Sequence, residues 1–237
     1  MRNILFLLFL MIGCLGMPAN VGRDVGREVD REVVSASLDS TIALIKEGEV
    51  SPYCTGVWVG ADYILTAYHC VMPSLEELLQ MNAEELILLD SKKINYITRN
   101  DNLELFEKPS ILRDAIVIGL DPKLDLALLR VSGDIPLHMV VQIADKVNVG
   151  ECVHIVGHVQ GLSWTYMQGV LSAQRIKDGV SLLQVSAPIY FGVSGGGGFN
   201  DMGELLGITS FIFKAPNIGF LIDNTEIKKF LSLNLKK

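Results

Sequence analysis

Three side chains of the kinds that carry out acyl transfer stand in short segments with distinctive surroundings. A strand-like run at residues 63–68 leads directly into His69. Asp125 immediately precedes an apolar segment, which tends to bury its carboxylate, and a buried carboxylate is costly unless it is paired. Ser194 lies among glycines. A carboxylate can orient an imidazole of pKa near 6.5, which can then activate a serine hydroxyl as a nucleophile.

The glycines around Ser194 add a second element of this chemistry. Gly192 precedes the serine by two positions, and glycines fill residues 195–198. Glycine permits unusual φ angles and close approach of a substrate. The backbone N–H groups of Gly192 and Ser194 can therefore converge on one point and hold an oxyanion, which is worth roughly 3–4 kcal/mol in a transition state. Alone, the segment could equally be a glycine-rich loop with an idle serine.

Two cysteines bear on the segment that carries His69. Cys54 and Cys70 stand on neighbouring strand-like runs and can bridge in an exported protein, where a disulfide would hold the histidine in place. Cys152 is then left over, and we interpret it as a small buried hydrophobic residue.

The start of the chain reads as a targeting signal. Residues 1–17 carry Arg2 and an apolar run at 4–12, which is shorter than the roughly 20 residues of a membrane-spanning helix. We expect a signal peptide and an exported protein: periplasmic, secreted or lipid-anchored. The residues up to Cys14 partly match a bacterial lipobox, so lipidation and membrane attachment through Cys14 are one alternative, and ordinary cleavage that discards Cys14 is the other. Residues 18–37 predict a charged, flexible linker.

Composition excludes several functional classes. The chain has 237 residues, 49% of them hydrophobic, enough for a sizeable core. Its 20 Lys and Arg residues against 27 Asp and Glu residues give a net charge of −7. We therefore expect no nucleic-acid partner. Since no zinc-protease motif, Cys-x-x-Cys pair or dinucleotide-binding glycine motif is present, we expect neither a metal nor a cofactor.

Short β-type runs separated by turn residues predict an all-β fold of Greek-key sandwiches or barrels. Two segments, 73–85 and 224–235, predict helices. The expected strands fall into two series, the first at 41–45, 55–59, 63–67, 86–89, 94–98, 115–120 and 127–131, and the second at 140–143, 152–156, 164–171, 182–187, 205–213 and 218–222.

The three segments together resemble those of trypsin-like serine peptidases. TAYHC at 66–70, DLALLRV at 125–131 and GVSGGG at 192–197 are similar to that family's histidine, aspartate and serine boxes. Residues 150–173 and 217–222 resemble the HtrA/Deg-like branch, here without a PDZ domain. The resemblance implies two six-stranded Greek-key β-barrels with the active site between them and a C-terminal helix. The N-terminal barrel would span 38–135, and the C-terminal barrel with the helix 136–237.

The resemblance also implies residue roles. His69, Asp125 and Ser194 would form the catalytic triad, with Gly192 and Ser194 as the oxyanion hole. The substrate pocket would be formed by Pro188, Thr209, Ser210 and Phe211. Because no acidic residue stands at the expected pocket base, we expect small or apolar rather than basic side chains in it. Substrates would be proteins or peptides, and the sequence predicts no oligomeric state.

One departure concerns Val193, which stands where the family has Asp or Asn. Without that carboxylate we expect no activation by insertion of a new N-terminal amine. The departure also keeps open a second hypothesis, a catalytically inactive homologue that binds peptides in the inter-barrel cleft. An esterase of the α/β-hydrolase type is excluded, because its triad runs Ser, Asp, His along the chain.

Overall fold

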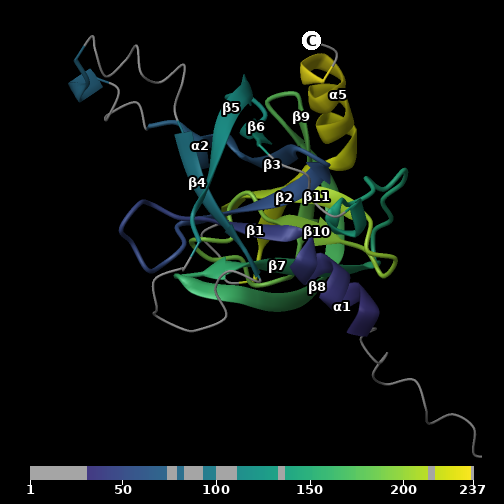
Figure 1. Ribbon diagram of the computed structural model, residues 1–237. Helices are drawn as coiled ribbons and strands as arrows, with labels where there is room; N and C mark the ends of the chain where they lie inside the picture. The colour runs from purple at the N-terminus through teal and green to yellow at the C-terminus, as the bar shows by residue number, and fades with distance from the viewer. Residues whose placement is uncertain are drawn as a thin grey trace, which may run out of the picture.

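The computed structural model describes residues 31–73, 79–82, 93–99, 111–132, 137–212 and 217–235, with the side chains of 211 and 212 excepted (Figure 1). The predicted signal peptide with Cys14, most of the predicted helix 73–85 and the predicted strand 86–89 lie outside these residues.

The N-terminal half forms a closed antiparallel barrel with the strand order β1-β2-β3-β6-β5-β4. β3 coincides with its predicted run in full. Each of the other five strands begins and ends within two residues of a predicted run. Its strands are β1 (Thr41–Leu44), β2 (Cys54–Gly60), β3 (Tyr63–Ala67), β4 (Lys93–Thr98), β5 (Arg113–Asp121) and β6 (Leu126–Val131).

The C-terminal half forms a second closed antiparallel barrel, in the order β10-β11-β12-β9-β8-β7. The predicted architecture of two six-stranded barrels is therefore confirmed, and closure leaves neither sheet with a free edge. The strands are β7 (Cys152–Val159), β8 (Leu162–Lys177), β9 (Val180–Val185), β10 (Gly197–Phe199), β11 (Leu205–Ile212) and β12 (Gly219–Asp223).

Two segments of the second barrel differ in kind from the sequence prediction, and β8 extends six residues beyond the end of the predicted run 164–171. The segment 140–143 is not a strand: a short 3₁₀ helix, η3 (Leu137–Met139), precedes it, and only Ile143 makes an isolated bridge, to Leu205. The short strand β10 was not predicted, because glycine has low β-propensity. It forms because β7 and β11 offer backbone partners on its two sides.

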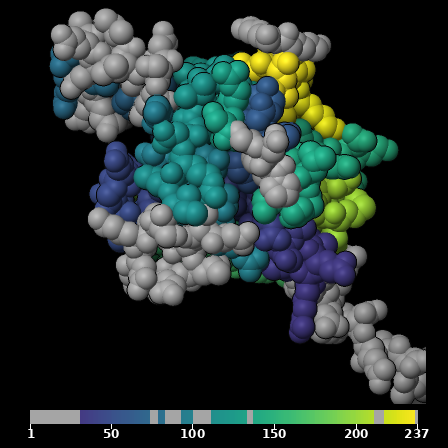
Figure 2. Space-filling model, viewed as in Figure 1, coloured from purple at the N-terminus to yellow at the C-terminus, as the bar shows by residue number. Residues whose placement is uncertain are grey.

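The C-terminal helix α5 (Asn224–Asn234) confirms the prediction for this segment. The side chain of Asp223 caps it by accepting the N–H of Thr225. Ile227, Phe230 and Leu231 are buried in a core cluster that contains side chains of both barrels. Figure 2 shows α5 at the surface against residues of the first barrel, so the helix ties the two halves together.

A second helix, α1 (Arg31–Asp39), lies where the end of the flexible linker was predicted. Val33 and Ser37, one helical turn apart, are buried, and the helix contacts β7 and β8 of the second barrel (Figure 1). The apolar spacing from residue 33 onward suits a helix once a surface is there to cover. No helix in the described ranges is both long and apolar enough to cross a membrane.

Candidate active site

The pairing of β3 with β6 brings His69 and Asp125 together. Ala67, the last residue of β3, pairs with Leu126, the first of β6, so the residues just beyond each strand end become neighbours. His69 lies in the short helix α2 (Tyr68–Val71). Its Nδ1 is 2.9 Å from Oδ2 of Asp125, and its backbone N–H donates to Oδ1 at 3.1 Å. The predicted pair therefore meets.

A second side chain fixes the carboxylate from the other barrel. Ser210, on β11, donates its hydroxyl to Oδ2 of Asp125 at 2.5 Å. Asp125 itself has a φ of 56°, in the left-handed region, which turns its side chain back toward α2. Since a carboxylate only accepts, Nδ1 of His69 must carry the proton, and Nε2 keeps a free lone pair. This is the tautomer that a general base needs.

Ser194 lies beside the histidine segment, on a turn of the second barrel. Its carbonyl accepts the backbone N–H of Thr55 at 2.9 Å, and Sγ of Cys70 lies 3.6 Å from the same oxygen. Among the residues that the structure covers, the Ser194 hydroxyl has no hydrogen bond to His69. Such bonds are often long in free enzymes and shorten when substrate is bound.

The carbonyl oxygen of Phe191 fixes the peptide group that contains the N–H of Gly192. Phe191 O accepts the N–H of Gln160 at 2.7 Å, and the N–H of Gly192, in the same trans peptide, points the opposite way. Gly192 has a φ of 91°, and a Cβ there would lie 2.0 Å from the carbonyl oxygen of His158. No other residue fits this position.

The carbonyl oxygen of Val193 fixes the peptide group that contains the N–H of Ser194 in the same manner. It accepts the hydroxyl of Thr209 and, at 2.9 Å, the N–H of Gly196. In the part of the chain described, neither the N–H of Gly192 nor that of Ser194 is hydrogen-bonded. Both N–H groups are therefore available to a ligand, as an oxyanion hole requires.

Val193 holds this loop by packing. Its side chain is fully buried in the core of the second barrel, against Gly157. An aspartate here would need a cation, whereas valine needs only the apolar surroundings that it has.

The residues expected to form the substrate pocket have more specific tasks than the sequence indicated. Thr209 is fully buried and its hydroxyl supports the loop, while Ser210 orients Asp125. Pro188 is half-buried, and the side chain of Phe211 lies outside the described atoms. The support from Thr55, Gln160 and Ser210 was not predicted, because nothing local in the sequence marks these residues.

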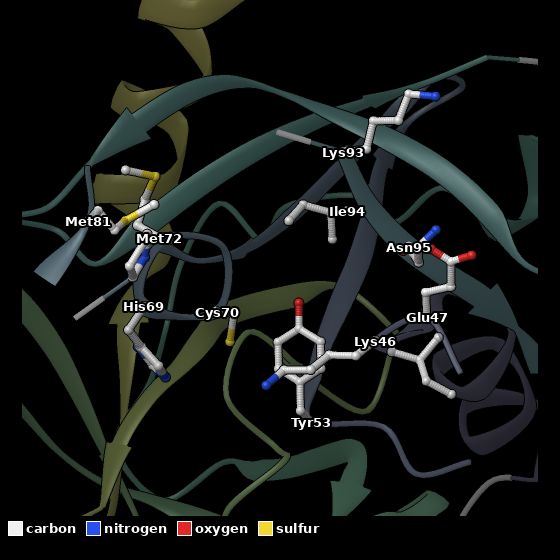
Figure 3. A pocket seen from close by; sticks show the side chains of 12 residues that line it. Lys46, Glu47, Tyr53, His69, Cys70, Met72, Met81, Lys93, Ile94 and Asn95 are labelled. Atoms are coloured by element: carbon white, nitrogen blue, oxygen red, sulfur yellow. The ribbon is translucent and has the colours of Figure 1, made fainter. Parts of the chain in front are cut away.

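A hollow of about 540 Å³ opens beside His69 on the side of the first barrel (Figure 3). Burial raises the pKa of Tyr53, one of its lining residues, to about 12, so its hydroxyl stays neutral. Apolar, sulfur-containing and charged side chains share the lining, which is formed by Ile45, Lys46, Glu47, Tyr53, His69, Cys70, Met72, Pro73, Met81, Lys93, Ile94 and Asn95.

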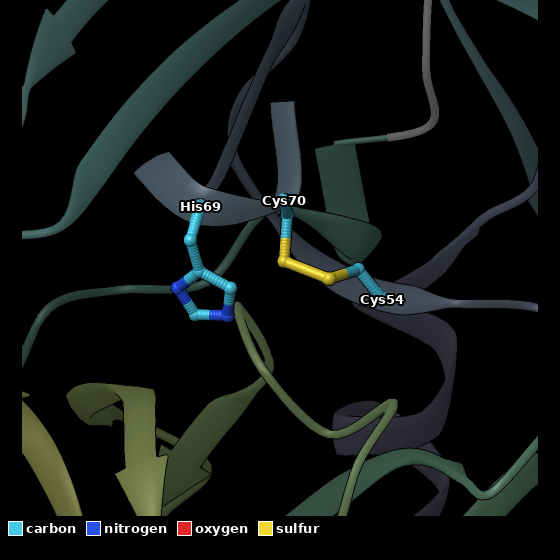
Figure 4. A group of neighbouring side chains, drawn as sticks. All are labelled: Cys54, His69 and Cys70. Carbon is cyan, nitrogen blue, oxygen red and sulfur yellow. A yellow bond between two sulfur atoms is a disulfide. The ribbon is translucent and has the colours of Figure 1, made fainter. Parts of the chain in front are cut away.

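The predicted disulfide is confirmed: Cys54 and Cys70 are bonded, with 6.0 Å between their Cα atoms (Figure 4). The bridge joins the start of β2 to α2 and so holds the helical turn that carries His69. Cys152 is a free, half-buried thiol.

Comparison with known proteins places this arrangement in a family. Residues 54–208 match the family model described as the trypsin-like peptidase domain, which spans more than half of the chain. The chain belongs to the trypsin-like peptidase family.

Relatives of this trypsin-like peptidase include proteins described as periplasmic endoproteases. A probable periplasmic serine endoprotease DegP-like of Brucella suis biovar 1 (strain 1330) is 34% identical over 134 residues, 52% of this chain and 26% of the relative. The periplasmic serine endoprotease DegP of Salmonella typhimurium (strain LT2) is 28% identical over 166 residues, 62% of this chain and 34% of the relative. The chain thus spans about a third or less of these relatives.

Solved structures share the fold. The HtrA-type protease AlgW with a decapeptide superposes with a TM-score of 0.69 at 20% identity, covering 87% of this chain and 67% of AlgW. The inactive form of Rv3671c from M. tuberculosis H37Rv superposes with a TM-score of 0.66 at 18% identity. The match covers 88% of this chain and 93% of Rv3671c. At these identities the likeness concerns the double-barrel fold alone.

Proposed function

We propose that this trypsin-like peptidase is an exported serine endopeptidase that uses His69, Asp125 and Ser194 as its catalytic triad. The observation that carries the proposal is the bond of 2.9 Å between Nδ1 of His69 and Asp125. It leaves the Nε2 lone pair free, beside a serine flanked by two unengaged N–H groups. The names of the DegP relatives support the activity and the export.

The reaction follows from this geometry. Nε2 of His69 takes the proton of the Ser194 hydroxyl as Oγ attacks the scissile carbonyl carbon. The N–H groups of Gly192 and Ser194 hold the oxyanion, and Asp125 stabilises the charged imidazole. His69 then protonates the leaving amine as the C–N bond breaks, which leaves an acyl-enzyme. Water, activated by the same imidazole, hydrolyses the ester and restores the serine.

Substrates in this proposal are proteins or peptides with a small or apolar residue before the cleaved bond. The expected pocket base is Pro188 and not an acidic residue, which supports this preference. Profiling with a peptide library would test it, and preferential cleavage after Lys or Arg would contradict it.

Labelling with a fluorophosphonate tests the nucleophile directly. We expect the purified wild-type chain to be labelled, and the Ser194→Ala and His69→Ala variants to remain unlabelled. Labelling of Ser194→Ala would overturn the assignment of the serine. A well-folded wild-type chain that takes no label would favour the second candidate, an inactive homologue that binds peptides in the cleft.

We also propose that residues 1–17 act as a signal peptide, with lipidation of Cys14 as the membrane-attached alternative. The apolar run at 4–12 supports export. Intact-mass analysis of the mature chain separates the two outcomes, because a lipidated chain begins at Cys14 with an added acyl mass, whereas ordinary cleavage leaves an unmodified N-terminus.

A further inference from the structure

Three side chains with metal-binding atoms meet at the edge of the active site. Cys54, His69 and Cys70 each offer one ligand atom, and these atoms all lie within 4.8 Å of one another (Figure 4). In the structure the two sulfur atoms are bonded to each other, so neither is a thiolate. Breaking that one bond would release two thiolate ligands next to an imidazole.

His69 is already oriented as a metal ligand. Its Nδ1–H is held by Asp125, and a metal-bound histidine almost always donates its other ring N–H to such a partner. Figure 4 shows the second ring nitrogen, Nε2, on the side of the ring that faces the disulfide. The lone pair is thus fixed on this side of the ring, and the ligand atoms of the three residues lie within 4.8 Å of one another.

We propose that reduction of the Cys54–Cys70 disulfide converts this cluster into a site for Zn²⁺ with two thiolates and one imidazole as ligands. A dithiol attacks one sulfur of the bridge, and its second thiol resolves the mixed disulfide. Two electrons pass to the bridge, giving two cysteine thiols and the oxidised dithiol. Zn²⁺ then displaces the two thiol protons into solvent and accepts the Nε2 lone pair, and a water molecule fills the fourth position.

The dimensions and the ligand types fit zinc. Zn–S bonds of about 2.3 Å keep two sulfur ligands of a tetrahedral site about 3.8 Å apart, within the span of this cluster. Thiolate and imidazole ligands together favour zinc over hard cations such as magnesium or calcium. Three protein ligands with an open fourth position is a common zinc arrangement.

The hollow beside His69 gives a reductant or a metal ion access to the Cys54–Cys70 disulfide. Cys70 and His69 both line it, so a reductant or a metal ion can reach the bridge from solvent although both cysteines are more than nine-tenths buried (Figure 3). Its volume of about 540 Å³ is large enough for a small dithiol and for the water on the fourth position.

Zinc at this site would switch off the proposed peptidase. Nε2 cannot both coordinate zinc and accept the Ser194 proton. Reduced protein would therefore be inhibited by zinc, and removal of the metal followed by reoxidation would restore activity. This consequence depends on the proposed function, whereas binding of the metal does not.

Titration of the full-length chain with Zn²⁺ and Co²⁺ tests the site, before and after reduction with a water-soluble phosphine. We expect one Co²⁺ per reduced chain with the charge-transfer absorption of thiolate ligands, and no such absorption from the oxidised chain. Loss of outer-shell partners of zinc typically costs about 10- to 100-fold in affinity, so removing the ligand in His69→Ala should weaken binding at least that much. Cys152→Ser is the matched control and should bind like wild type. Ser194→Ala should also bind, which separates the metal site from catalysis.

Near-ultraviolet circular dichroism establishes whether the reduced chain stays folded. Unfolding on reduction would overturn the proposal, because the site needs both thiols and the imidazole in their folded positions. Equal metal affinity in the oxidised and reduced chains, or in wild type and His69→Ala, would overturn it as well. If the oxidised, metal-free chain takes no fluorophosphonate label while the reduced chain binds zinc, the proposed activity fails and the zinc site stands.

Discussion

Mild acid should destabilise this fold through one buried histidine. His158, at the end of β7, has no exposed surface. Its Nε2–H donates to the carbonyl of Ile42 in the first barrel at 3.2 Å, and its Nδ1 accepts the N–H of Trp164, also at 3.2 Å. Both ring nitrogens are thus satisfied in the neutral form. Burial lowers the pKa of His158 to about 4.

The lowered pKa of His158 determines the direction and the size of the pH effect on the free energy of unfolding. In the unfolded chain the imidazole takes up its proton near its ordinary pKa of 6.5, so between pH 6.5 and pH 4 the unfolded chain binds more protons than the native one. The free energy of unfolding therefore falls as the pH falls through this window. The complete effect is about 3 kcal/mol, since each pH unit of pKa lowering corresponds to about 1.4 kcal/mol. About 2 kcal/mol of it is lost between pH 7 and pH 5.

Urea unfolding at pH 7 and pH 5 measures the effect. His158→Gln is the informative variant, because its amide can still donate to Ile42 and accept from Trp164 but has no proton to gain. Any cost of the substitution itself is present at both pH values and cancels. We expect wild type to lose about 2 kcal/mol more than the variant between the two pH values. His138→Gln, at an exposed site, should behave like wild type.

Equal losses in wild type and His158→Gln would refute the reasoning. That result would mean that His158 takes up its proton in the folded protein as readily as in the unfolded chain. The contact between the end of β7 and Ile42 would then be open to water in solution.

Three further predictions concern substitutions with defined outcomes. Asp125→Asn should slow fluorophosphonate labelling by about 10,000-fold without unfolding the chain, because asparagine tolerates the left-handed backbone but cannot hold the required histidine tautomer. Gly195→Ala should destabilise by more than the ~1–3 kcal/mol of backbone strain alone, since its Cβ would lie 2.2 Å from the carbonyl oxygen of Thr55, and the melting temperature measures this. Phe230→Ala should cost about 3–5 kcal/mol in urea unfolding, whereas Leu233→Ala on the exposed face of the same helix should change stability by less than about 0.5 kcal/mol.

Most of the strands could be predicted because their own side chains carry the signal. β3 and β6 are β-rich runs bounded by turn residues, and local pattern was sufficient there. β10 gave no such signal, since two of its three residues are glycines. Its strand conformation is imposed by the strands on either side, which sequence neighbours do not reveal.

The helix α1 was misjudged for a related reason. Residues 31–39 are too few to form a stable helix in isolation, and the glycines and charges that precede them favour a flexible tether. The helix is stable because Val33 and Ser37 are buried, and it contacts β7 and β8 of the second barrel. That surface is built from residues more than a hundred positions away.

The candidate site shows the same division between local and distant information. The types and order of His69, Asp125 and Ser194 could be predicted, because each stands in a short segment with a chemical reason. The role of Ser210 could not. The register of β11 against β12 shifts between Thr209 and Phe211, so Ser210 occupies a β-bulge. A bulge re-aims the side chain of the extra residue, and here that side chain reaches Asp125 across the interface between the barrels. The bulge cannot be read from the sequence. Through it, Ser210 of the second barrel orients the carboxylate of Asp125 in the first barrel.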